Sequence, residues 1–175
     1  GCAEDRPFIG ARSVDPKWRS RGGVYLPFNW RGWLDFGGGA HADMACHTKD
    51  TIFMSQDPRF PTHVEALNVD TLTDDAFPSG STLKWTFGPN GNRPGFDVYW
   101  YDGTDNQYTD KDGNLRRHPR LEELAQGAQL AGSGNLYVGT KHTLLVSGDY
   151  GDSCRIIPND AYKDFSRTLK DATGS

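Results

Sequence analysis

The chain has 175 residues, a length that fits one domain with a sizeable core. Its formal net charge is −4, and lysine and arginine are scattered along it, which excludes the basic footprint of a nucleic-acid-binding protein or of one drawn to an anionic membrane. No run approaches the roughly 20 apolar residues that a membrane helix needs. The predicted partner is therefore a small neutral or polar molecule.

The composition is rich in turn formers and rings, with 21 glycines, 10 prolines and 12% aromatic residues. It predicts a turn-rich fold whose core and clefts depend on aromatic side chains, which suits carbohydrate binding. Three cysteines, Cys2, Cys46 and Cys154, are too few and too widely spaced for a disulfide framework, so reduced thiols are expected. Both a cytoplasmic and an exported protein remain open.

Hydrophobic periodicity and turn residues predict the elements in chain order. Residues 1–33 lack a sustained period and are predicted to form an irregular arm. A helix over 40–54 is expected after the Gly37-Gly38-Gly39 triplet. The later elements are strands over 62–69, 81–87 and 96–101, a polar surface segment over 102–117, a helix over 119–124, strands over 135–138 and 143–146, and an amphipathic helix after Pro158.

This order predicts an α+β fold made of a single domain over residues 1–175. Helices are expected on one face of a mostly antiparallel, open-faced sheet. The other face of that sheet is left for solvent or for a partner.

The predicted first helix carries the residue pair best suited to chemistry. Asp43 and His47 are four residues apart and share one helix face, with Asp50 one turn further. A carboxylate beside an imidazole fixes its tautomer and raises the proton affinity of the other nitrogen, as a general base requires. Gly38 and Gly39 lack side chains, so a nicotinamide or sugar ring could approach the backbone there. The alternative is an ordinary helix with a solvated Asp/His face.

An aromatic segment precedes the glycines, where Trp30 and Trp33 flank Arg31. Indole rings stack on the apolar faces of sugars, and an arginine fork binds hydroxyls or a carboxylate. The alternative is that these rings pin the arm to the core.

The same helix offers further metal-ligand types, because His41 and Cys46 accompany Asp43 and His47. These four side chains point in directions around a helix that do not converge on one ion. No metal site is therefore predicted.

Two sequence runs resemble the C-terminal domain of the Gfo/Idh/MocA family, the relatives of glucose-fructose oxidoreductase and inositol dehydrogenase. The first is NWRGWLDFGGGAHADMACH at residues 29–47, followed by Asp50 and by PTHVEA at 61–66. The second is LYVGTKHTLL at 136–145, then Tyr150-Gly151 and RIIP at 155–158, similar to the family's closing strands and final helix. The resemblance covers nearly the whole chain.

The resemblance implies hydride transfer between a carbon of a sugar or polyol and NAD or NADP. His47 matches the family's catalytic histidine, and Asp43 matches the acidic residue that orients the substrate or the imidazole. The substrate site is further expected to include Trp30, Arg31, Trp33, His41 and Asp50. The family often has an apolar residue where His41 stands, so this extra imidazole could alter substrate choice.

The dinucleotide site of the family lies mainly in an N-terminal Rossmann domain. Its glycine fingerprint and Glu-Lys-Pro motif are absent here, so the chain looks like a domain fragment that is inactive alone. The open sheet face of the family commonly packs on another subunit, which implies a homo-oligomer. Two alternatives remain: a domain of an NAD-dependent glycosidase, and a non-catalytic carbohydrate-binding or structural module.

Overall fold

The computed structural model describes residues 29–70, 72–161, 163 and 165. The chain divides into two compact units: unit 1 is residues 1–45 with 59–107, and unit 2 is residues 46–58 with 108–175. The predicted α+β class with antiparallel strands is confirmed, and the strands of the described residues belong to three separate sheets. Most of the predicted arm, residues 1–28, lies outside the described residues.

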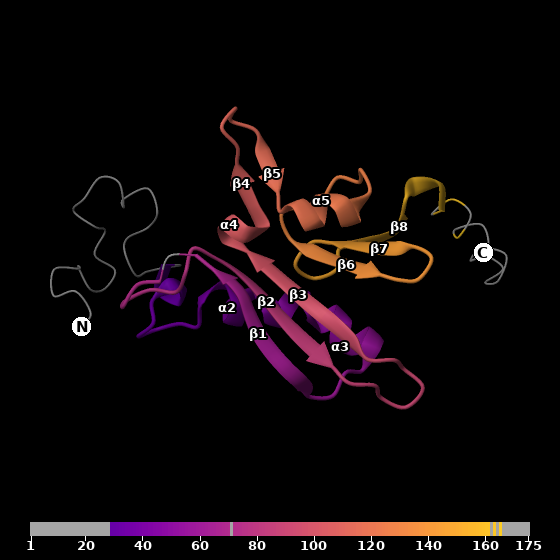
Figure 1. The fold of residues 1–175 in the computed structure, drawn as a ribbon, viewed down its shortest axis with the longest axis horizontal. Coiled ribbons are helices and arrows are strands. Elements are labelled where there is room, and N and C mark those ends of the chain that lie inside the picture. The colour runs from indigo at the N-terminus through magenta and orange to yellow at the C-terminus, as the bar shows by residue number, and fades with distance from the viewer. Residues whose placement is uncertain (1–28, 71, 162, 164, 166–175) are drawn as a thin grey trace. The chain divides into compact units, whose positions relative to one another are not determined.

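Unit 1 is built on the three-stranded sheet β1-β2-β3, whose strands lie side by side in Figure 1. The predicted strands in this part of the chain are confirmed, and both neighbouring pairs are antiparallel. The elements of the unit are the 3-10 helix η1 (Asn29–Gly32), the first part of α2 (Gly39–Thr48), β1 (Pro61–Val69), β2 (Gly80–Phe87), β3 (Phe96–Asp102) and α4 (Gly103–Asn106).

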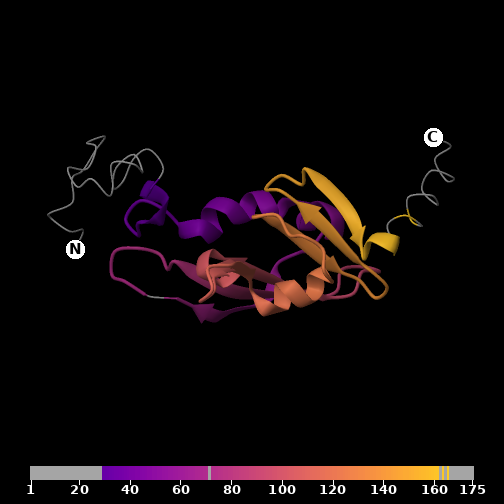
Figure 2. The ribbon, with the colours of Figure 1, turned by 90° about the horizontal axis from the view of Figure 1, so that it is seen from above.

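Helix α2 covers one face of this sheet (Figure 2). The imidazole of His41 stacks on Trp85 of β2 with ring centroids 4.8 Å apart and meets the edge of Trp100 of β3 at 5.5 Å. Further along the same face Phe87 and Phe96 stack at 5.2 Å. Side chains alternate between the two faces of a strand, so these aromatic residues all lie on the face that α2 covers, where they form the core of unit 1.

The opposite face of the sheet is polar. Lys84 pairs across the strands with Tyr99, and its ammonium lies 3.1 Å from the Asp97 carboxylate. A hydrogen bond from Thr86 and then the contact with Lys84 lower the pKa of Asp97, and the Asp97 contact raises the pKa of Lys84. Every residue of β1 is exposed, so this edge strand extends the open face.

Two carboxylates, Asp102 and Asp105, accept hydrogen bonds at the end of the sheet where β3 leads into α4. We call this pair the carboxylate corner. Asp102 accepts hydrogen bonds from Ser81 N at 2.6 Å, Ser81 Oγ at 3.0 Å and Trp100 Nε1 at 2.7 Å. Asp105 accepts from Thr82 Oγ1 at 2.7 Å. Buried Ser81 and Thr82 are thereby satisfied by carboxylates, as buried polar groups require.

Unit 2 is built on the three-stranded antiparallel sheet β6-β7-β8, with α5 beside it (Figure 1). Its elements are the end of α2, α3 (Asp50–Gln56), β4 (Gln107–Thr109, whose first residue belongs to unit 1), β5 (Leu115–Arg117), α5 (Pro119–Ala125), β6 (Gly134–Val138), β7 (Thr143–Ser147) and β8 (Ser153–Ile157). The core gathers around the central strand β7, where Leu145 and Val146 are buried with Ile157 of β8 and Ala125 of α5.

Three details of the described residues differ from the prediction. The helix predicted over 40–54 is two helices that are interrupted at Lys49. The segment 102–117, predicted as a surface excursion, contains α4, β4 and β5. Hydrophobic pattern alone did not predict β8 (Ser153–Ile157). Residues 159–161, 163 and 165 are helical as expected after Pro158, and the rest of that predicted helix lies outside the described residues.

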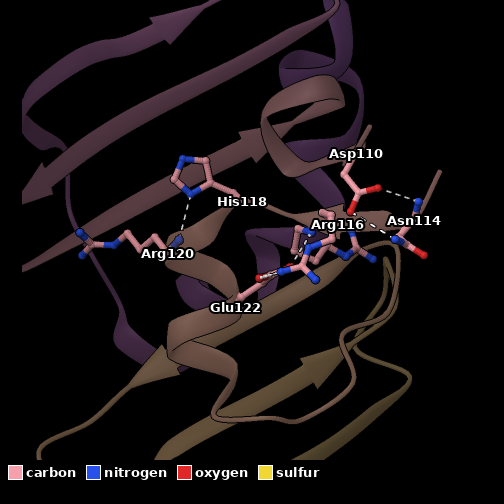
Figure 3. Close-up of polar contacts among 7 residues, drawn as sticks. Asp110, Asn114, Arg116, His118, Arg120 and Glu122 are labelled. Carbon is pink, nitrogen blue, oxygen red and sulfur yellow. Dashed lines mark hydrogen bonds and ion pairs between the residues drawn. The ribbon is translucent and has the colours of Figure 1, made fainter. Parts of the chain in front are cut away.

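Polar side chains fix the start of α5 (Figure 3). His118 precedes Pro119 and accepts a hydrogen bond from Arg120 N at its Nδ1, 3.2 Å away, so it caps the helix. Oε2 of Glu122, in the first turn of α5, forms an ion pair with the guanidinium of Arg116 at 2.8 Å. In the preceding loop Asp110 accepts from the backbone of Asn114, which lowers the pKa of Asp110. Asp110 thus stabilises the turn at residues 110–114 through bonds to the backbone.

Gly103 provides a test of the carboxylate corner. Its φ is +49°, and a Cβ there would lie 1.7 Å from the carbonyl oxygen of Ser79. Gly91 is a matched control, because its φ is +58° and nothing lies within 4 Å of the Cβ position. We expect Gly91→Ala to lower the free energy of unfolding by about 1–2 kcal/mol, and Gly103→Ala by at least about 3 kcal/mol, in urea denaturation. Equal losses would show that backbone conformation alone, without the contact, makes Gly103 necessary.

Candidate functional site

The predicted site residues fall into both units, because the boundary between the units lies inside α2, between Ala45 and Cys46. Unit 1 holds Trp30, Arg31, Trp33, His41 and Asp43, with Gly38 and Gly39; unit 2 holds His47 and Asp50. Each group is described within its own unit.

Asp43 is paired with Arg31 in unit 1. Oδ2 of Asp43 lies 2.7 Å from Nε of Arg31, and the guanidinium lies over the ring of Trp30 at 5.2 Å from its centroid. Both partners of the ion pair are largely buried, with side-chain exposures of 24% and 29%. The structure thus brings together three predicted site residues and gives the Asp43 charge a guanidinium partner.

The backbone around η1 is tied to the segment before β2. Leu34 N donates to Asp75 O and Phe77 N donates to Gly32 O, both at 2.9 Å, and Trp33 forms a bridge with Ala76. These bonds favour the alternative in which the aromatic segment is pinned to the core. Trp30 nevertheless keeps 37% of its surface exposed.

The glycines at the start of α2 have a structural requirement. Gly39 has φ +70°, and a Cβ there would lie 2.7 Å from the ring of Phe77. A Cβ at Gly38 would meet the Cβ of Ala42 at 2.4 Å. Only glycine fits these positions, and at Gly39 the space that a side chain would need is filled by Phe77.

In unit 2, His47 meets an aromatic residue that sequence reasoning did not assign to the site. The imidazole contacts Tyr150 edge-on, with ring centroids 5.0 Å apart and an angle of 62° between the planes. His47 is half-buried and Tyr150 is 71% exposed. Tyr150 was visible in the sequence only as part of the family resemblance, and nothing in its spacing indicates that it would reach His47.

A hydrogen-bonded cluster holds the end of α2 and the start of α3 to β6. Asn135 Nδ2 donates to the carbonyl of Thr48 at 2.7 Å and to Thr51 Oγ1 at 3.2 Å. Thr51 Oγ1 also lies 3.3 Å from Thr48 O and 2.5 Å from the hydroxyl of Tyr137. Since Thr51 has one hydroxyl proton, donating it to Thr48 leaves Tyr137 as the donor to Thr51. The cluster satisfies one of the carbonyls left unpaired where α2 ends.

Lys49 occupies the interruption between the two helices. Its backbone is helical, with φ −77° and ψ −13°, and its carbonyl accepts from Ile52 N at 2.9 Å and Phe53 N at 3.1 Å. Its side chain is half-buried. Burial disfavours the ammonium and lowers the pKa of Lys49 from 10.5 to about 8. The Lys49 amine therefore loses its proton at a lower pH than the amine of an exposed lysine.

The lowered pKa of Lys49 predicts a pH-dependent stability. Between pH 8 and 10.5 the unfolded chain binds the extra proton and the folded chain does not, so the free energy of unfolding should rise with pH across this window. We expect Lys49→Met to remove that rise and to stabilise the protein below pH 8, where the buried charge opposes folding. Lys111→Met, at an exposed position, is the control. Urea denaturation from pH 6.5 to 10.5 measures both, and identical pH profiles for Lys49→Met and the wild type would refute the assignment.

No protein-family model matches the chain, and no curated protein matches it significantly. Within residues 29–161, apart from residue 71, no three His, Cys, Asp or Glu side chains gather as a metal site would need. Searching the helices of the described residues finds none with the length and apolar character to span a bilayer.

Proposed function

We propose that the chain is the substrate domain of an NAD(P)-dependent oxidoreductase that acts on a sugar or polyol. The observation that carries the proposal is the setting of His47, a half-buried imidazole near the end of α2 whose ring contacts an exposed tyrosine. An accessible imidazole that is held in place by packing suits general acid–base chemistry. The family resemblance of residues 29–47 supports the same reading.

The chain carries no GxGxxG sequence, so its own residues do not fit a dinucleotide site. The proposal assigns NAD or NADP to a separate Rossmann domain, where the bound nicotinamide would supply the hydride acceptor. His47 would take the proton of the substrate hydroxyl. In unit 1, Arg31 is held by Asp43 in an ion pair. Asp43 in this proposal is a positioning residue.

The polar face of β1-β2-β3 completes the proposal. It carries the Lys84–Asp97 ion pair, with the Lys84 ammonium 5.7 Å from the centroid of the Tyr99 ring. The family that residues 29–47 resemble commonly packs its open sheet face on another subunit, so we assign this face to contact with a second copy of the chain in a homo-oligomer.

Replacement of His47 tests the chemical role. In an enzyme that joins this chain to its Rossmann domain, we expect His47→Ala to lower kcat by roughly 10² to 10⁴ and to leave the affinity for the dinucleotide unchanged, because only proton transfer is removed. His142→Ala is the control, since His142 is exposed in the turn between β6 and β7. Stopped-flow and steady-state assays of NAD(P)H formation measure the effect. Equal rates in both variants would remove His47 from the mechanism.

The assignment of the dinucleotide to another domain has its own test. A ligand that binds only the folded state increases the free energy of unfolding, by about 2.7 kcal/mol when its concentration is a hundred times Kd, and this increase raises Tm. We therefore expect Tm of this chain alone to stay constant in millimolar NAD or NADP, as measured by scanning calorimetry. A clear rise in Tm would place a dinucleotide site within residues 1–175.

A further inference from the structure

We infer that the exposed ring of Tyr150 is a stacking platform that selects cyclic sugars over open-chain polyols at His47. The inference rests on the proposed function and narrows its substrate class. It concerns unit 2 alone, where both residues lie.

The ring of Tyr150 contacts another side chain, yet most of it is exposed to solvent. Its ring meets His47 at 5.0 Å, yet 71% of its surface is open. A tyrosine used only for packing would bury most of its ring, because that burial is what stabilises the fold. Here the edge contact with the imidazole leaves ring surface free for a ligand.

The turn that carries Tyr150 requires glycine at two positions. Gly148 has φ +86°, and a Cβ there would lie 1.9 Å from the Asp152 carboxylate. Gly151 has φ +75°, and its Cβ position is 3.3 Å from Cγ2 of Thr51 on α3. Thr51 in turn is bonded to Asn135 of β6. The turn therefore lies near α3, and the Tyr150 ring beside His47 stays exposed.

An exposed aromatic ring beside an imidazole favours a ligand with both an apolar face and hydroxyls. The C–H groups on one face of a pyranose form such a surface, and they stack on aromatic rings while the hydroxyls at the rim stay free for polar partners. An open-chain polyol has the same hydroxyls but no rigid face, and it must lose rotational freedom when it is bound. The geometry thus predicts a preference for the ring form at His47.

The test is a binding titration of the whole chain with D-glucose and with D-sorbitol, its open-chain counterpart. Binding is followed by the imidazole C–H signals of His47 in NMR spectra, assigned by their loss in His47→Gln. In the wild type and in Tyr150→Phe we expect glucose to shift these signals and to bind at least about fivefold more tightly than sorbitol. In Tyr150→Ala we expect glucose affinity to fall about tenfold, to the level of sorbitol.

Tyr108→Ala is the matched control, because Tyr108 is a second exposed tyrosine of unit 2, on β4. It should bind as the wild type does. Equal glucose affinities in Tyr150→Ala and the wild type, a wild type that does not separate glucose from sorbitol, or no glucose shift at His47 would each overturn the inference. The proposed function is judged separately by the kcat of His47→Ala, so either idea can fail while the other stands.

Discussion

The hydrogen bond from the Asn135 amide to the Thr48 carbonyl fixes the point on which the site in unit 2 depends. A helix that ends leaves carbonyls without intrahelical partners, and a buried Thr48 makes an unsatisfied carbonyl costly. Because β6 supplies the missing donor, α2 can end before Lys49 and α3 can begin directly after it. His47 lies one residue before Thr48 and Thr51 lies three residues after it, so the hydrogen bond at Thr48 helps to position both side chains.

The same hydrogen-bonded cluster lies near the turn that carries Tyr150. Thr51 links the helix to Tyr137 and Asn135 of β6, and its methyl group lies near Gly151. In the same turn the Tyr150 ring contacts His47 while most of its surface stays exposed.

The acid and the imidazole of the predicted pair have different surroundings. Asp43 is held by a guanidinium above an indole in unit 1, whereas His47 touches a phenol ring in unit 2. Spacing of four on a helix places two side chains on one face. The carboxylate of Asp43 is nevertheless paired with the guanidinium of Arg31, which offers several N–H donors. Lys49 has a third kind of environment, because its burial disfavours the charged ammonium and lowers its pKa.

The sequence by itself determined the α+β class, the strands and helices with clear periods or caps, and the residue types that could act, such as the Asp and His of α2. These features depend on local backbone preference and on alternation, which neighbouring residues specify. Only the tertiary structure decided the partners: Arg31 for Asp43, Tyr150 for His47 and Asn135 for the carbonyl of Thr48. The members of each of these pairs are 12, 103 and 87 positions apart in the sequence. No local pattern encodes such contacts, because they exist only once the chain has folded and brought distant segments together.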